Sequence, residues 1–427
     1  MVSLGALLGL LVSGKFARVR KIDRTSLFLA ILCIACPFLT AFTNQDPIVN
    51  RLLFFNGLTA YDGLSMAAQA AIDLIPFWLG ATVLSDEAGR KALLRTMIVA
   101  MLLYSLPILV EVRLSPQFHR WVYGIHPHEF QQQVRDGAFR ATVFLKHGLV
   151  VAIFLAMSVT AAFGSRAWRA RISGVSTAVA GVYLTAILVL QKSLGALVFG
   201  VFGAAITLLT RPRMQMLVAA GIGALVLSYP VVRGSGLLPI ATIKEAAASY
   251  NADRASSLNL RLENEDRLLA KANERPLAGW GGWGRNRIFD AYSGRDLTVT
   301  DGMWIIIIGA FGWIGYLTRF GLLILPLLRG GATVLRGKAI SPEVAVLSLV
   351  LAINLLDLLP NSSLTPVTWL MAGALCGIGQ ARRSSAVVQS DEERAADEQE
   401  KAAPGDAEQN LGPIRVPHGG VVARMRP

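Results

Sequence analysis

The chain has 427 residues, of which 53% are hydrophobic and only 16% are charged, and its mean hydropathy is +0.51. Soluble domains carry about 25% charged residues, so this composition excludes an ordinary soluble enzyme. A formal net charge of +13 would suggest nucleic-acid binding in a soluble protein, but the distribution of the basic residues has a different explanation.

Apolar segments long enough to cross a bilayer recur along the chain. A membrane-spanning helix needs about 17–25 predominantly apolar residues. We therefore predict an all-α polytopic membrane protein with about 10–11 transmembrane helices. An apolar run at residues 2–12 is too short to span by itself. The predicted spans are residues 26–43, 64–84, 94–111, 141–163, 173–190, 194–210, 214–232, 303–328, 342–360 and 365–380.

The basic residues predict which side of the membrane each loop occupies. Short loops that alternate to one side contain 18 Lys and Arg residues, and the opposing short loops contain 6. Because cytoplasmic loops are enriched in Lys and Arg, residues 15–24 and the C-terminal tail are expected in the cytoplasm. The loops at 112–140 and 233–302 are then extracytoplasmic. The predicted parts are thus residues 1–232 with seven helices, the large loop at 233–302, the last helices at 303–380 and a tail at 381–427, whose polar composition predicts disorder.

Cysteine and histidine residues give no metal or disulfide prediction. Cys33 and Cys36 lie in an apolar helix without a βαβ context, where they are small packing residues. His126 and His128 flank Pro127, which prevents a helical histidine pair, and no further ligand follows at a recognisable spacing. We expect neither a metal nor a cofactor.

Ionisable residues at membrane depth are costly and mark candidate sites. Lys192 lies in a tight turn between two spans, where it either binds an anionic lipid headgroup or snorkels to the interface. Arg319 and Asp357 are expected to pair between the last helices. The complete set is Asp73, Lys146, His147, Lys192, Arg319 and Asp357.

The segment at 233–302 is the only long polar stretch before the tail, and a helix is expected at 241–271. The sequence from Gly279 to Gly284 matches G-x-G-x-x-G, but it lacks the strand and helix that a dinucleotide site requires. Two interpretations stay open. Trp280 and Trp283 either rest at the headgroup level in a tight turn, or form a platform for a sugar or isoprenoid beside open glycine amides.

Basic residues predicted on the extracytoplasmic side form a candidate phosphate site. Arginine pairs bidentately with phosphate, so a pyrophosphate-linked lipid is a natural ligand. The alternative is a solvated loop whose charges balance locally, since 233–302 contains ten basic and nine acidic residues. The candidates are Arg135, Arg140, Lys192, Arg261, Arg267, Arg285 and Arg287.

Several short motifs follow one another along the chain in a fixed order. They are Gly137-Ala-Phe139 before a span, Ser193-Leu-Gly195-Ala196, Arg261-Leu-Glu-Asn-Glu265 followed by Arg275-Pro-Leu-Ala-Gly279-Trp-Gly281, and Asp301-Gly-Met-Trp304 followed by Gly309-Ala-Phe-Gly312-Trp-Ile-Gly315. Together with the large loop and the three spans after it, this pattern over residues 25–380 resembles the bacterial O-antigen ligase and polysaccharide polymerase superfamily.

The resemblance implies an all-helical glycosyltransferase in the bacterial inner membrane, with a cytoplasmic C-terminal tail. Proteins of this family move a glycan from undecaprenyl pyrophosphate to an acceptor sugar or lipid at the outer face, without a metal. Implied partners are these substrates, membrane lipids and other polysaccharide export proteins, and no nucleic acid. Asp301 stands where the family usually has His, and Leu194 stands where it has Arg, which favours a polymerase over a ligase.

The resemblance also implies roles for single residues. Asp301 would be the general base, with His147 as a second candidate, although an Asp at this position can also cap the following helix. Arg261, Arg140, Lys192 and Arg285 would bind the phosphates or the substrate, and Trp280 and Trp283 would hold sugar or lipid.

Two other functions compete with glycan transfer. A secondary transporter for a small anionic or sugar solute would explain the intramembrane charges, but no repeat halves are visible. A non-catalytic partner in envelope-polysaccharide assembly would tolerate the absence of the family His.

Overall fold

The computed structural model describes residues 5, 22–49, 51–125, 133–135, 137–236, 242, 244–245, 248–249 and 252–378. Three segments lie outside the described residues: the predicted tail at 381–427, residues 15–21 with their four basic side chains, and most of the short apolar run at 2–12. His126, His128 and the side chain of Arg135 also lie outside them.

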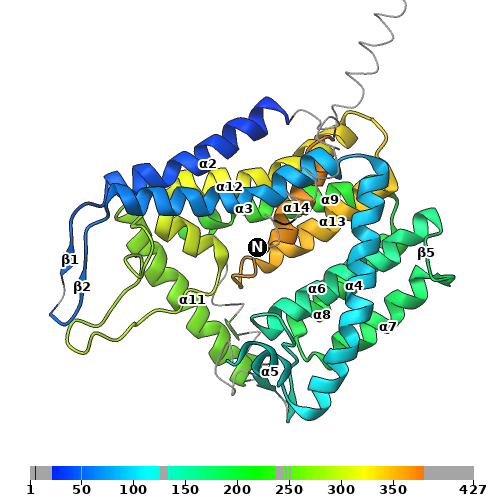
Figure 1. Cartoon of the computed structure of the whole chain (residues 1–427), viewed down its shortest axis with the longest axis horizontal. Helices are drawn as coiled ribbons and strands as arrows, with labels where there is room; N and C mark the ends of the chain where they lie inside the picture. Colours follow the sequence, from blue (N-terminus) through cyan, green and yellow to red (C-terminus); the bar gives the residue numbers. More distant parts are fainter. Residues whose placement is uncertain are drawn as a thin grey trace, which may run out of the picture. The chain divides into compact units, whose positions relative to one another are not determined.

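The described chain is predominantly helical (Figure 1), and each of the ten predicted spans contains a helix. Among the described residues, six helices are long and apolar enough to cross a membrane, namely α2, α3, α4, α6 with the 3-10 turn η3, α9 and α12. The chain is therefore an all-α polytopic membrane protein, as predicted. The helices are α2 (Arg24–Phe42), α3 (Ala60–Val83), α4 (Glu87–Leu114), α5 (Phe118–Tyr123), α6 (Gly148–Gly164), η3 (Ser165–Trp168), α7 (Thr177–Leu190), α8 (Leu194–Leu209), α9 (Pro212–Gly234), α11 (Ala252–Asn273), α12 (Met303–Leu335), α13 (Pro342–Asp357) and α14 (Pro366–Leu375).

Strand structure is confined, in the described residues, to three antiparallel hairpins in loops. They are β1 (Ile48–Val49) with β2 (Phe54–Phe55), β3 (Val134–Arg135) with β4 (Ala138–Phe139), and β5 (Arg171–Ile172) with β6 (Val175–Ser176). Strands of two residues cannot form a core of their own, so the hairpins shape loops between helices.

Helix α13 lies at the centre of the core. Nearly all of its residues are buried, and it packs against α4, α6, α8, α9 and α14. Elsewhere small residues bring backbones together. A Cβ on Gly80 of α3 would overlap the Leu370 carbonyl of α14, and a Cβ on Gly373 would overlap the Phe77 carbonyl of α3. Close backbone packing of this kind is how helices associate where lipid removes the hydrophobic driving force.

Polar contacts tie the loops together at each end of the helices. At one end Arg329 pairs with Asp23 at 2.9 Å and Arg90 with Glu343 at 3.4 Å. At the other end, which contains α11 and is here named the α11 end, Asn44 donates to the Gly279 carbonyl at 2.9 Å. Helix α2 runs from Asp23 at the first end to Thr43 at the α11 end, so loops distant in sequence meet at each end.

Candidate functional site

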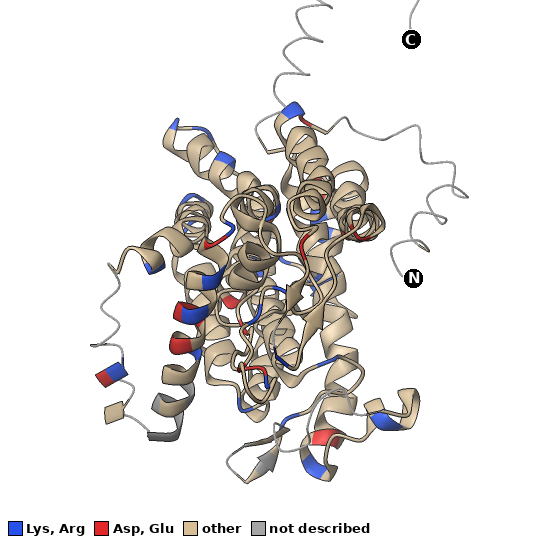
Figure 2. Ribbon diagram, turned by 90° about the vertical axis from the view of Figure 1, so that its left-hand side faces the viewer, with Lys and Arg blue, Asp and Glu red and all other residues tan. Residues whose placement is uncertain are grey.

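Helix α11 is an amphipathic helix held against the membrane helices by a buried arginine. Arg233, in the last turn of α9, pairs with Glu265 at 3.3 Å and Asp266 at 2.6 Å and donates to the Leu262 carbonyl at 3.1 Å. Burial raises the pKa of Glu265, and the Arg233 charge opposes that rise. Figure 2 shows Lys, Arg, Asp and Glu residues gathered along this helix, in contrast to the tan membrane helices.

The turn after α11 fills a break in the membrane helix α12. Gly312 lies inside α12 with φ 64° and ψ −165°, a conformation that interrupts the helical hydrogen bonds. The freed carbonyls of Gly309 and Ala310 accept from Trp280 N and Gly281 N, both at 2.9 Å. The freed amides Trp313 N and Ile314 N donate to the Pro276 and Leu277 carbonyls at 2.7 and 3.3 Å. All four backbone groups are thereby satisfied, as is required at membrane depth.

This docking explains the glycine-rich pattern at 279–284. Gly279 has φ 68°, and a Cβ there would overlap the backbone of Ala310 and Phe311. The amides of Trp280 and Gly281 are bonded to α12. These two amides are therefore not open to phosphate oxygens, and this part of the pattern forms a tight turn against α12.

The two tryptophans of the turn have different environments. Trp280 is 8% exposed, donates Nε1–H to the Lys271 carbonyl at 2.8 Å, and lies against Lys271 Nζ, 3.5 Å from its ring centre. Trp283 is 58% exposed and has a φ of 56°, which is rare for a large side chain. Only Trp283 presents its ring for a contact with sugar or lipid.

Arg285, predicted to bind substrate, holds two loops together instead. It is 2% exposed and donates to the carbonyls of Trp280, Asn56 and Asp46 at 3.2, 2.6 and 3.0 Å. Burial lowers the pKa of the guanidinium, and the nearby Asp46 charge opposes that effect. Because these donors are directed at backbone carbonyls, Arg285 positions the turn.

Arg261 and Asp301 form the ion pair at the centre of the candidate site. Arg261 Nε on α11 lies 3.3 Å from Asp301 Oδ2, and both side chains are about one-third exposed, at 34% and 37%. Burial raises the pKa of Asp301, and the Arg261 charge opposes the rise. The N-cap of α12 is Gly302 without a side-chain cap, so Asp301 does not cap the helix.

A second carboxyl group, Asp357 at the end of α13, is close enough to Arg261 for their charges to attract each other. It accepts from Asn361 Nδ2 at 2.8 Å and Ser363 Oγ at 2.5 Å. Arg319, predicted as its partner, instead lies 4.0 Å over the Phe311 ring. The predicted Arg319–Asp357 pair is therefore wrong, because α12 turns Arg319 toward its own kink.

Arg140 and Lys192 lie together in a second cluster. Arg140 is 2% exposed and donates to the Lys192 carbonyl at 3.2 Å. The neighbouring Gln191 side chain pairs with both backbone groups of Ala141, at 3.0 and 2.9 Å. Lys192 has a φ of 50° in the tight turn that joins α7 to α8, as the sequence predicted. The buried Arg140 guanidinium thus stabilises this turn through its hydrogen bond to the Lys192 carbonyl.

His147 and Glu111 fix the loop that leads into α6. His147 is the N-cap of α6, and its Nδ1 accepts from Leu149 N at 3.0 Å. Glu111, at the end of α4, accepts from Thr142 N at 2.8 Å and Val143 N at 2.7 Å. Glu111 was not among the residues predicted from the sequence, although an acidic residue near the end of a span is itself a signal for a buried polar contact.

Neither protein-family models nor curated protein sequences match this chain. Its function is therefore inferred from the residues of the site.

Proposed function

We propose that the chain is a polymerase-type glycosyltransferase that moves a glycan from undecaprenyl pyrophosphate to an acceptor sugar at the outer face of the bacterial inner membrane. The observation that carries this proposal is the Arg261–Asp301 ion pair, located where the large polar loop returns to the membrane helices. A cation for pyrophosphate and a base for a hydroxyl group are the two functions that such a transfer requires.

The pair supports a direct displacement. Asp301 takes the proton from the acceptor hydroxyl as that oxygen bonds to the anomeric carbon. The bond from this carbon to the pyrophosphate oxygen breaks, and undecaprenyl pyrophosphate leaves while the Arg261 guanidinium stabilises its charge. Because burial raises the pKa of Asp301, its carboxylate is a stronger base than an exposed aspartate.

The sidedness of the proposal rests on the basic residues and on loop contacts. The loop after α2 and the large loop, which meet at the α11 end, both lie on the side that the excess of 18 over 6 basic residues assigns to the outside. Reporter fusions after Gly236 and Glu263 should be active only with an extracytoplasmic reporter. A fusion after Ser390 should be active only with a cytoplasmic one. Inward-facing fusions at Gly236 and Glu263 would rule out transfer at the outer face.

The mutational test replaces Arg261 in a strain whose polymer synthesis depends on this gene. Arg261→Ala is expected to abolish the polymer and build up single repeat units. Arg261→Lys should be severely impaired, since a point charge does not reproduce a bidentate fork. Arg295→Ala is the matched control, because Arg295 is exposed in the same loop. Normal polymer from Arg261→Ala at normal protein abundance would remove Arg261 from the site.

A transporter is the competing class, and the broken helix α12 is the feature that favours it, since transporters bind solutes at discontinuous helices. In this chain, however, the freed backbone groups at Gly309–Ala310 and Trp313–Ile314 bond to the turn at 276–281. They are not left to coordinate an ion or solute. Normal glycan with altered solute uptake in a deletion strain would support the transporter.

A further inference from the structure

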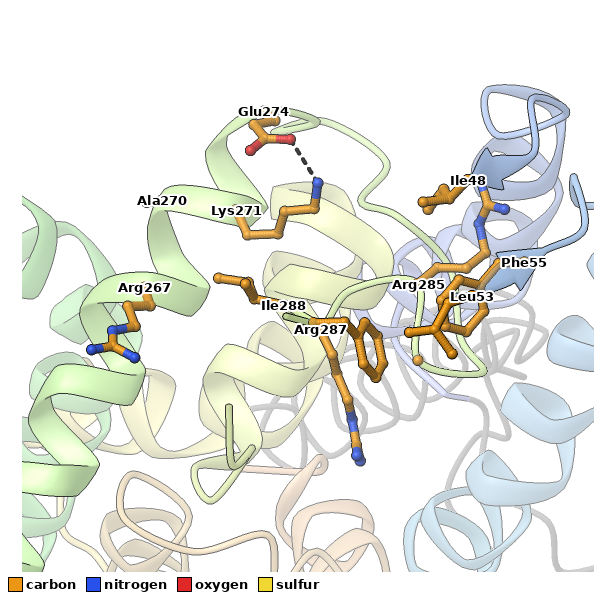
Figure 3. Close-up of a pocket in the computed structure, with 12 residues that line it drawn as sticks. Ile48, Leu53, Phe55, Arg267, Ala270, Lys271, Glu274, Arg285, Arg287 and Ile288 are labelled. Atoms are coloured by element: carbon orange, nitrogen blue, oxygen red, sulfur yellow. Dashed lines mark hydrogen bonds and ion pairs between the residues drawn. The ribbon is translucent and has the colours of Figure 1, made fainter. Parts of the chain in front are cut away.

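A groove separate from the Arg261–Asp301 pair lies at the α11 end. It has a volume of about 460 Å³, within the range of about 300–1,000 Å³ that is usual for small-ligand sites. Its walls come from α11, the loop at 284–289 and the β1–β2 hairpin (Figure 3). Three segments distant in the sequence therefore build one concave surface.

The groove and the ion pair use different faces of α11. Arg267, Lys271 and Glu274 are spaced by four and three residues, which places them on one face of a helix. Arg261 lies six residues before Arg267, which separates the two side chains by about 120° around the helix axis. A ligand in the groove therefore contacts side chains that do not take part in the ion pair.

The charged side chains that line the groove are mainly cationic. Within the described part of the chain, the Arg267 guanidinium has no ion pair or hydrogen bond, and its side chain is exposed. Arg287 is 45% exposed and pairs at 2.9 Å with Asp296, which lies outside the groove. Lys271 is paired with Glu274 at 2.8 Å. Arg285 also lines the groove, but its donors are bonded to backbone carbonyls. An anion in the groove would therefore be met by the unpaired Arg267 and by Arg287, which would exchange Asp296 for it.

The opposite wall is apolar and aromatic. Phe55 and Phe289 stack with ring centres 5.3 Å apart, and Ile48, Leu53 and Ile288 continue the surface. The C–H face of a sugar ring packs on such a wall by dispersion, while guanidinium groups pair with carboxylates. An inorganic phosphate would use only the cations. The combination of a cationic rim and an aromatic wall fits a sugar ring that carries a carboxylate.

We propose that this groove binds acidic, carboxylate-bearing sugars of the acceptor glycan and holds the growing chain beside the transfer site. The inference rests on the proposed function for the identity of that glycan as a substrate. Binding itself is a property of Arg267, Arg287 and the apolar wall, and it can be measured without transfer.

The test uses the full-length protein in phosphatidylcholine nanodiscs, with short oligogalacturonate as the probe and a maltooligosaccharide of equal length as the neutral control. Calorimetry should show binding of the oligogalacturonate alone, weakening as salt is added. Arg267→Gln and Arg287→Gln should each raise the dissociation constant about tenfold, as expected for one charged hydrogen bond. Arg295→Gln, a charge change in the same loop outside the groove, should leave it unchanged.

The outcomes separate this inference from the proposed function. The groove proposal would be refuted if oligogalacturonate did not bind or if the neutral sugar bound equally well. Unchanged binding by Arg267→Gln and Arg287→Gln would refute it as well. Binding that appears only when phosphatidylglycerol replaces the neutral lipid would assign the groove to lipid headgroups and overturn it too. Binding that depends on Arg267 would support the groove as a binding site. If Arg261→Ala also makes full polymer, the proposed transferase function would be refuted while the groove proposal stands.

Discussion

Replacing Gly312 by Ala is expected to destabilise the protein, because the break in α12 depends on a conformation that only glycine adopts easily. At φ 64° and ψ −165° a Cβ costs about 1–3 kcal/mol of backbone strain. A Cβ at this position would also overlap the Leu277 carbonyl and the backbone of Pro276. The substitution therefore pushes the turn at 276–281 away from the helix.

The magnitude follows from the contacts that this turn makes. Four backbone hydrogen bonds join it to α12, and each contributes about 0.5–1.5 kcal/mol. With the strain, the free energy of unfolding should fall by at least about 3 kcal/mol. The expected loss is large because the freed groups of α12 have no water to replace the turn.

Unfolding can be measured by titrating the protein with SDS in mild detergent micelles and following tryptophan fluorescence. Gly321→Ala is the matched control in the same helix, because its Cβ would meet only Leu29 Cδ1 at 3.6 Å. This control should be neutral or more stable by up to about 1 kcal/mol, the helix propensity gain of Ala over Gly. Equal stability of the Gly312→Ala and Gly321→Ala proteins would refute the reasoning.

Three further predictions concern single side chains. Asp301→Asn should lower polymer synthesis by on the order of 10²–10⁴. The pKa of Asp301 is raised by burial, so the wild-type rate should fall with decreasing pH already above the range of an ordinary aspartate, and a profile without this acid limb would count against Asp301. Arg285→Met should lower the free energy of unfolding by about 3 kcal/mol or more, since it orphans buried carbonyls; an unchanged SDS midpoint would contradict this. His147→Ala should cost about 1 kcal/mol of stability as a lost N-cap and less than tenfold in polymer yield. A near-complete loss of polymer at normal abundance would instead make His147 the base.

The amino-acid sequence by itself determined the membrane helices. Each predicted span contains a helix, because an apolar run of sufficient length has to satisfy its backbone groups internally in lipid. The tight turn at Lys192 and the helix that ends before Pro276 were also predictable, since local chemistry sets such turns and breaks. The motifs singled out Arg261 and Asp301 separately, whereas their 3.3 Å pairing came from the structure.

Only the tertiary structure decided which of the singled-out side chains face a ligand. Arg285 and Trp280 look like binding residues in the sequence, yet both are buried by partners that include the carbonyl of Asn56, 229 positions from Arg285. Arg319 likewise turned away from Asp357. Burial and hydrogen bonding depend on segments that meet only after folding, so sequence spacing could not separate residues that brace the loop from residues that remain open to substrate.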